Sequence, residues 1–215
     1  MNRKLCVVVP YRDREQHLKE FIPSICDTLD KQKIDFHVII VEQEPGKLFN
    51  RAKLLNVGYA VTGGIYDYYC FHDVDMIPLE SDYSYCESPT HLAARAEQFD
   101  WKLPYEHYFG GVTIFDKQSF EIINGYSNEY FSWGAEDDDI FNRCVLHKIK
   151  LSRKNCSYKS LFHTRNIEKD QYSKNMQLLS TWHERTASDG LNSLKYTLIS
   201  REKITDKSEK ITVSI

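Results

Sequence analysis

The chain has 215 residues, of which 41% are hydrophobic and 13% aromatic, enough for one domain with a sizeable core. Charged residues make up 27% of the chain, yet the net charge is only −3. This argues against a protein held to nucleic acid mainly by excess positive charge, and against a long disordered tail. No stretch approaches the ~18 apolar residues of a membrane helix, and Pro10 closes the first apolar run too early for a signal peptide. The default expectation is a soluble, cytoplasmic protein.

The six cysteines form no C-x-x-C pair, so a zinc site or a thioredoxin-type motif is not expected. Cys6 and Cys70 lie in apolar, strand-like runs, and Cys144 lies on the apolar side of a predicted helix. We expect small buried side chains with free thiols.

The first half of the chain alternates between strand-like and helix-like segments. The expected strands are 4–9, closed by Pro10, then 36–41 and 66–71, and the expected helices are 15–32 and 50–60. Pro23 should break or kink the first helix. This alternation predicts an α/β unit with a largely parallel sheet, and ligands of such sheets bind at the carboxyl ends of the strands.

The second half is less regular. Its pattern predicts helices over 117–123, capped by Asp116, and over 136–150, with a loop over 124–135 between them and partial helix over 166–186. The expected strands are 112–115, 157–163, and the terminal strands 196–200 and 211–215, which lie on either side of the charged stretch 201–210.

Asp73, Val74 and Asp75 follow the third apolar strand. Residues two apart on a strand point the same way, so the two carboxylates could share a divalent cation that also binds a diphosphate. A solvated acidic turn explains this short pattern equally well when it is taken alone.

Four acids, residues 136–139, open a predicted helix directly after Trp133, Gly134 and Ala135. The helix dipole offsets part of their repulsion, but capping and solubility need only one or two acids. Crowded carboxylates raise one another's pKa, which prepares a general base. Trp133 could be a platform for a sugar face, although a core position is the commoner one for a lone Trp.

Three arginines lie near predicted strand ends: Arg12, Arg14 and Arg51. They could hold phosphates, or they could form ordinary surface ion pairs. His163 follows an apolar run, and a lone His is more often structural than a ligand. It becomes a metal candidate if the fold brings it to Asp75.

Together these motifs resemble one family, the β-1,4-galactosyltransferases, from about Leu5 to Ser200. Seven segments carry the resemblance in order: Val9–Arg14, Phe49–Gly58, His72–Pro78, Tyr108–Val112, Asn124–Asn128, Trp133–Arg143 and Asp189–Leu194. The resemblance implies a GT-A fold, an α/β architecture with a Rossmann-like mixed sheet flanked by helices. It implies a single catalytic domain over 1–215, with a nucleotide-sugar-binding half to about residue 110 and an acceptor-binding, catalytic half from about 111.

The implied reaction is the inverting, Mn²⁺-dependent transfer of galactose from UDP-galactose to a sugar hydroxyl of a glycan or glycoconjugate, forming a β-1,4 linkage. By resemblance, Asp137 is the catalytic base, and Asp75 and His163 bind the metal. The implied substrate-binding positions are Pro10, Tyr11, Arg12, Arg14, Phe49 and Arg51 on the nucleotide side, Asp73, Val74, Tyr108 and Gly111 near the sugar, Trp133 and Gly134 in a closing loop, and Glu136 and Asp138 on donor and acceptor. The size of Tyr108 favours galactose over N-acetylgalactosamine.

Some positions depart from the family pattern. Ser160 stands where some members have a methionine metal ligand, which leaves the third protein ligand open. The Trp133 loop has fewer glycines than the family's Trp-Gly-Trp-Gly-Gly. Animal members are anchored in the Golgi membrane; a trimmed catalytic domain would work in that lumen, where Cys70 and Cys86 could pair.

The acceptor, of N-acetylglucosamine, glucose or xylose type, stays open at this point, and neither a nucleic-acid partner nor a membrane span is expected. A non-catalytic sugar or nucleotide-sugar binding module with the same fold is the alternative from another class. The presence of both Asp75 and Asp137 favours the enzyme over such a module.

Overall fold

The structure, a computed structural model, describes residues 3–164 and 168–215, and these form two sheets and five α-helices. The larger sheet contains β1 (Lys4–Tyr11), β2 (Asp35–Gln43), β3 (Tyr68–His72), β5 (Thr90–His91), β7 (Val112–Asp116), β8 (Ser152–Arg153), β10 (Thr197–Thr205) and β11 (Ser208–Ser214). The smaller sheet contains β4 (Met76–Glu80), β6 (Arg95–Ala96) and β9 (Ser157–Ser160). The helices are α1 (Glu15–Lys31), α2 (Arg51–Val61), α3 (Lys117–Ile122), α4 (Glu136–Leu146) and α5 (Lys169–Ser180).

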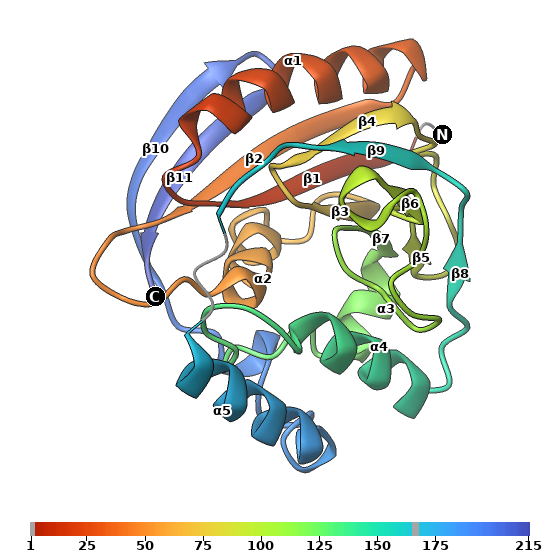
Figure 1. The fold of residues 1–215 in the computed structure, drawn as a ribbon. Coiled ribbons are helices and arrows are strands. Elements are labelled where there is room, and N and C mark those ends of the chain that lie inside the picture. The colour runs from red at the N-terminus through yellow and green to blue at the C-terminus, as the bar shows by residue number, and fades with distance from the viewer. Residues whose placement is uncertain (1–2, 165–167) are drawn as a thin grey trace.

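The larger sheet has the strand order β10-β11-β2-β1-β3-β7-β5-β8. Strand β1 is parallel to both β2 and β3, and β11 is parallel to β2, whereas β7 runs antiparallel to β3. Helix α1 lies on one face of this sheet, and α2, α3 and α4 lie on the other (Figure 1). The predicted architecture, a mixed sheet flanked by helices, is therefore confirmed.

Alternation along β1 divides the core between the two faces. Leu5, Val7 and Val9 pack with the buried side of α1, which includes Phe21 and Ile25. The even-numbered residues of the strand point to the other face, where they pack against α2, α3 and α4. A strand buried on both faces reads as a continuous apolar run, which is the signal that located β1 in the sequence.

Two prolines do not end the elements in which they lie. Pro10 is inside β1 and pairs in register with Val41 of β2. The register of β1 with β3 ends at Val8 and Phe71, so no strand on that side requires an N–H from Pro10. Pro23 lies within α1, which continues unbroken to Lys31. The expected break is wrong because buried residues on both sides of Pro23 hold the helix on the sheet.

Other boundaries also differ from expectation. Helix α4 ends at Leu146, and the charged stretch 201–210 belongs mostly to the hairpin of β10 and β11. Charges are compatible with β10 because it is an exposed edge strand. Asp116 caps α3 as predicted, accepting a hydrogen bond from the backbone N–H of Ser119. The short strands β4, β5, β6 and β8 were not expected.

All six cysteines carry free thiols, so the conditional pairing of Cys70 with Cys86 is not present. Burial raises the pKa of the Cys70 thiol well above its ordinary value. Among the described residues, no helix is both long enough and apolar enough to cross a bilayer.

Candidate functional site

Residues that follow β1, β3 and β9 lie together at one edge of the larger sheet. Asp75 follows β3 and His163 follows β9, and their Oδ2 and Nε2 atoms are 2.9 Å apart. On the other side of the imidazole, the Arg14 guanidinium lies 3.1 Å from Nδ1. Burial acts to raise the pKa of Asp75, but the hydrogen bond and the charge of His163, together with a backbone hydrogen bond and the charge of His17, lower it overall. The hydrogen bond with Asp75 raises the pKa of His163. The condition that made His163 a metal candidate is met in this geometry.

Arg51, the first residue of α2, joins the two acidic motifs. Its Nε donates to Asp73 Oδ1 at 2.6 Å, and its Nη1 lies 3.7 Å from Glu136 Oε1. Burial raises the pKa of Asp73 to about 6 although the Arg51 charge opposes the shift. The ion pairs place the end of β3 beside the start of α4.

Asp137 lies in the first turn of α4, against Gly110. A Cβ atom at Gly110 would lie 2.5 Å from Asp137 Oδ2 and 2.8 Å from the Tyr108 hydroxyl, so a larger residue here would displace one of these side chains. Burial, followed by the charges of Glu136 and Asp138, raises the pKa of Asp137 to about 8. The ionised form of a carboxyl group with this pKa is a stronger base than an ordinary aspartate, which suits it to accept a proton from a hydroxyl group.

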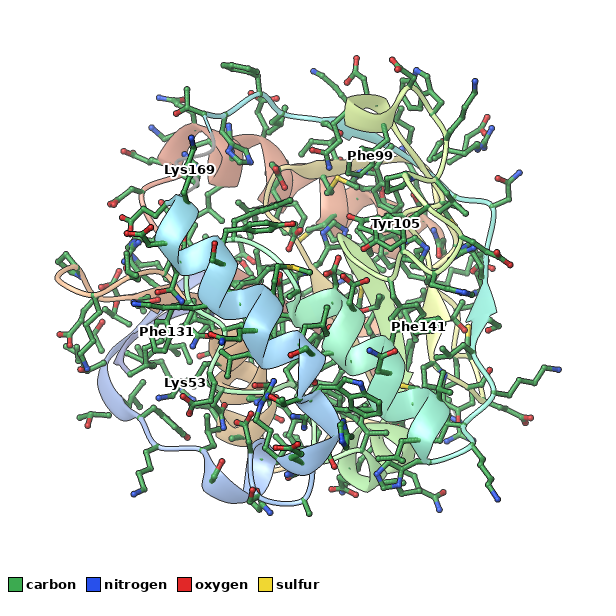
Figure 2. All side chains as sticks on the ribbon, turned by 60° about the horizontal axis from the view of Figure 1, so that its bottom comes forward. Lys53, Phe99, Tyr105, Phe131, Phe141 and Lys169 are labelled. Carbon is green, nitrogen blue, oxygen red and sulfur yellow. The ribbon has the colours of Figure 1, made fainter. Side chains whose placement is uncertain are left out.

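Asp138 faces an aromatic residue that the sequence reasoning missed. The Tyr105 hydroxyl donates to Asp138 Oδ1 at 2.9 Å, and its ring packs edge-on against Tyr108. Figure 2 shows Tyr105 on the segment that links β6 to β7. The ring of Tyr105 is partly exposed, whereas Tyr108 is buried. The motif Tyr108–Val112 pointed to this segment, but no sequence pattern distinguished Tyr105.

The nucleotide-side residues divide into buried and accessible ones. Pro10 and Tyr11 are buried at the end of β1, and Val74 is buried beside Asp75. Arg12 contacts the second of the family-like segments, Phe49–Gly58, because its guanidinium carbon lies 5.2 Å from the centre of the Phe49 ring. Arg12 also donates to the Lys47 carbonyl at 2.7 Å.

The loop before α4 contains Trp133, which is 45% exposed and stacks on Tyr172 of α5. The core position expected for a lone Trp is therefore wrong. Asn175 of α5 is fully buried, and its Nδ2 lies within 3.2 Å of the carbonyl oxygens of Phe131, Trp133 and Gly134. Gly134 has a φ of 103° and Ala135 a φ of 78°. Asn175 thus holds the loop that carries Trp133 by its backbone.

The loop over 124–128 is held in a similar way by asparagines of α2. Asn50 caps the helix and donates to the Asn128 carbonyl at 2.7 Å, and Asn56 donates to the Tyr126 carbonyl at 2.7 Å. Further down α4, Asp139 and Arg143 form a fully buried ion pair that Arg185 joins. These contacts fix the direction in which α4 presents its first turn.

The donor set fits a divalent cation such as Mn²⁺. Asp75 offers a carboxylate oxygen and His163 an imidazole nitrogen, ligand types that Mn²⁺ accepts. Across residues 3–164 and 168–215 there is no group of three or more His, Cys, Asp or Glu side chains arranged for a metal. Ser160 does not supply the missing ligand, because its hydroxyl faces the Met76 sulfur at 3.9 Å. Asp75 and His163 would by themselves leave coordination positions of such a cation open to other ligands.

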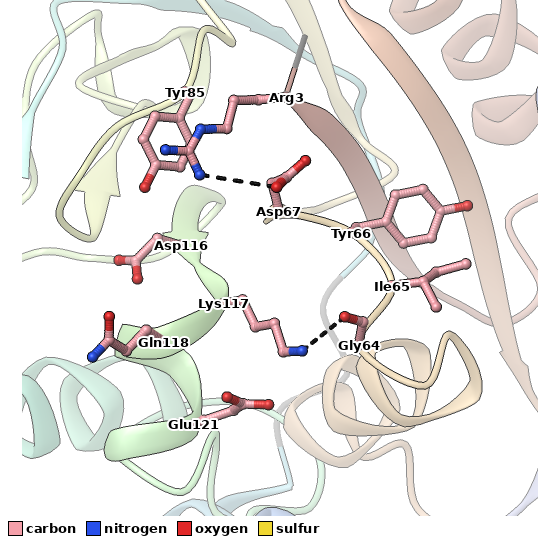
Figure 3. A pocket seen from close by; sticks show the side chains of 10 residues that line it. All are labelled: Arg3, Gly64, Ile65, Tyr66, Asp67, Tyr85, Asp116, Lys117, Gln118 and Glu121. Atoms are coloured by element: carbon pink, nitrogen blue, oxygen red, sulfur yellow. Dashed lines mark hydrogen bonds and ion pairs between the residues drawn. The ribbon is translucent and has the colours of Figure 1, made fainter. Parts of the chain in front are cut away.

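A separate pocket of about 360 Å³ lies at the opposite edge of the sheet, where β1 and β3 begin (Figure 3). Arg3 pairs with Asp67 across it, and Lys117 donates to the Gly64 carbonyl. None of the predicted site residues lines this pocket.

Two sequence profiles match consecutive parts of the chain. One, described as the N-terminal region of glycosyl transferase group 7, matches residues 1–87. The other, described as the N-terminal domain of galactosyltransferase, matches residues 90–167. Human β-1,4-galactosyltransferase 1 is 38% identical over 91% of this chain, and β-1,4-galactosyltransferase 4 of Cricetulus griseus is 39% identical over 93%. The chain belongs to the β-1,4-galactosyltransferase family.

The chain spans 51% and 60% of the length of these two relatives. Among solved structures, the catalytic domain of Drosophila β-1,4-galactosyltransferase 7 in complex with xylobiose superposes with a TM-score of 0.86 at 27% identity, covering 99% of this chain and 94% of that one. A mutant of the same Drosophila protein, in complex with manganese, UDP-Gal and xylobiose, gives 0.85 at 27% identity with the same coverage. The fold is therefore that of the GT-A glycosyltransferases.

Proposed function

We propose that this protein transfers galactose from UDP-galactose to a sugar hydroxyl with inversion, with Asp137 as the general base. The observation that carries the proposal is the Arg51 bridge, which connects the strand end holding Asp73 and Asp75 to the helix start holding Glu136 and Asp137. The proposed metal-binding pair and a carboxyl group of raised pKa would then belong to one site, which we call the cleft.

In the proposed reaction, the acceptor hydroxyl oxygen attacks the anomeric carbon from the face opposite the leaving group. A bond forms between that oxygen and the anomeric carbon, the bond from the carbon to the diphosphate oxygen breaks, and the hydroxyl proton passes to the Asp137 carboxylate. One displacement inverts the α-linked donor to a β-linked product. No covalent intermediate with the protein is required.

Asp75 and His163 would hold Mn²⁺, whose charge stabilises the diphosphate as UDP leaves. Arg12, Arg14 and Arg51 lie on the same edge of the sheet, where their guanidinium groups would bind phosphate or the uridine side. Glu136 Oε2 is buried and has no hydrogen-bond partner among the described residues. A donor-sugar hydroxyl in the cleft would satisfy that oxygen.

We further propose a division of labour within one catalytic domain. Residues before about 110 supply most donor contacts, and residues from about 111 onward supply the base, the Trp133 loop and the acceptor side. The exposed Trp133 ring, stacked on Tyr172, supports an acceptor role because sugars pack their apolar faces on aromatic rings.

An acceptor array tests the proposal. Purified protein with Mn²⁺ is given UDP-galactose, UDP-GalNAc or UDP-glucose, together with β-linked N-acetylglucosamine, glucose or xylose acceptors. We expect UDP release with UDP-galactose and at least one acceptor, and a β-1,4 linkage in the product by NMR. Tight donor binding without transfer to any acceptor would instead identify a nucleotide-sugar binding module.

A further inference from the structure

His91, on the short strand β5, is completely buried in a polar contact that the catalytic roles above do not use. Its Nε2 lies 2.9 Å from the Gly110 carbonyl oxygen. Its Nδ1 receives a hydrogen bond from Arg153 Nε at 3.0 Å. The carbonyl can only accept and the guanidinium can only donate, so the ring is the neutral tautomer with its proton on Nε2.

Arg153, on β8, extends this contact to two more carbonyls. Its Nη2 donates to the Tyr108 carbonyl at 2.9 Å and to the Glu106 carbonyl at 3.0 Å. Together the two side chains therefore bind three backbone oxygens within the segment 106–110. Burial lowers the pKa of His91 to about 3, so the ring stays neutral at ordinary pH and its Nδ1 can accept from Arg153.

The segment 106–110 lies against the start of α4, which carries the proposed base Asp137. The His91 ring packs edge-on against the Tyr108 ring, with 5.4 Å between ring centres. At the end of the same segment, Gly110 lies so close to Asp137 that a Cβ atom on Gly110 would be 2.5 Å from Asp137 Oδ2. A movement of this segment would change the space between the Tyr108 ring and Asp137.

We propose that His91 and Arg153 are positioning residues that hold the segment 106–110 and thereby set the donor selectivity that the family resemblance implies for Tyr108. The inference rests on the proposed function, because selectivity is defined by the donor sugar. Without the pair, three carbonyls lose their donors and the Tyr108 backbone is free to shift. A shifted Tyr108 admits the larger C2 substituent of N-acetylgalactosamine.

The test compares kcat/KM for UDP-GalNAc with kcat/KM for UDP-galactose in four variants. His91→Leu and Arg153→Met should raise the ratio about fivefold or more, the effect of roughly 1 kcal/mol. His91→Gln keeps one donor and one acceptor and should return the ratio to within about twofold of wild type. Arg95→Met is the matched control, because Arg95 pairs with Glu80 at the surface and should leave the ratio unchanged.

A merely structural role would lower both rates in proportion to the folded fraction, so a ratio unchanged in His91→Leu and Arg153→Met overturns the inference. If His91→Leu does not fold, Arg153→Met carries the test because Arg153 is an exposed residue, whereas His91 is fully buried. Wild-type protein that transfers no sugar contradicts the proposed function alone. In that case, calorimetry with Mn²⁺ gives the ratio of the affinities for UDP-GalNAc and UDP-galactose without turnover. An increase of this ratio in His91→Leu and Arg153→Met supports the inference, and an unchanged ratio overturns it.

Discussion

The two acidic motifs that Arg51 connects are held in different ways. Asp73 and Asp75 follow a strand whose backbone is fixed by registers with β1 and β7. Asp137 and Asp138 begin a helix after a loop that is held by side chains, of which Asn175 is the clearest example. The first motif is therefore placed by periodic hydrogen bonding, and the second by individual contacts from distant parts of the chain.

The energetics of the two motifs differ as well. Asp75 has a lowered pKa because His163 faces it, and it is ionised at low cost. Asp137 has a pKa raised to about 8 by burial and by its acidic neighbours. A motif on a rigid strand end suits a cation, whereas a carboxylate made more basic by its surroundings suits proton transfer.

Asp137→Asn should give the largest effect, because it removes the proposed base. We expect turnover to fall about 10²- to 10⁴-fold while UDP-galactose binding persists. The folded pKa lies above the unfolded one, so the ionised carboxylate destabilises the fold increasingly as pH rises from about 4 to 8. The variant should therefore melt at a higher temperature than wild type at pH 8.

The pH profile provides the control for this variant. In wild type, kcat/KM at constant Mn²⁺ should fall about tenfold for each pH unit below the pKa of Asp137. Near-normal turnover in Asp137→Asn, or a melting temperature that drops, would contradict the assignment.

Asp75→Ala tests the strand-end motif. It should abolish the Mn²⁺-dependent part of UDP binding, a loss of about tenfold or more in affinity measured by calorimetry. Asp82→Ala is a suitable control, because Asp82 pairs with Lys154 outside the cleft. Equal UDP affinity for wild type and Asp75→Ala in Mn²⁺ would refute the metal role.

Asn175→Ala tests the side-chain support of the Trp133 loop. Three backbone carbonyls lose their donor, so we expect a loss of about 1–3 kcal/mol in unfolding free energy and a several-fold higher acceptor KM. The exposed neighbour Gln177→Ala should change neither quantity. If both variants show the wild-type acceptor KM, the loop does not depend on Asn175.

Ala135→Gly should give the smallest effect. Relief of the positive φ, about 1–2 kcal/mol, offsets the lost methyl burial of about 0.8 kcal/mol and the added chain entropy of about 0.4–1 kcal/mol. In urea denaturation we expect the unfolding free energy of this variant to differ from wild type by less than about 0.5 kcal/mol. The control Ala60→Gly, inside α2, should lose about 1 kcal/mol of unfolding free energy. Equal losses in the two variants would show that the αL conformation of Ala135 is not strained.

The same contrast explains what the sequence could predict. The alternation of apolar strands and amphipathic helices located β1, β2, β3, α1 and α2 within a few residues, and the Asp73–Asp75 motif falls at a strand end as the pattern indicated. Asn175 and Tyr105 gave no such signal, because their importance depends on which carbonyl or carboxylate the folded chain brings to them. Trp133 was assigned to the core by residue type alone, although Tyr172, far along the chain, gives it an exposed stacking partner.

The parallel pairing of Ser208 with Val38 has a consequence for biogenesis. During translation, one edge of β2 has no hydrogen-bonding partner until the residues of β11 have left the ribosome. A nascent chain therefore exposes a long apolar strand with unpaired backbone amides. Such an edge is a template for intermolecular pairing. Expression hosts rich in nascent-chain chaperones should therefore improve the soluble yield of this protein, and truncation before Ser208 should send it into inclusion bodies.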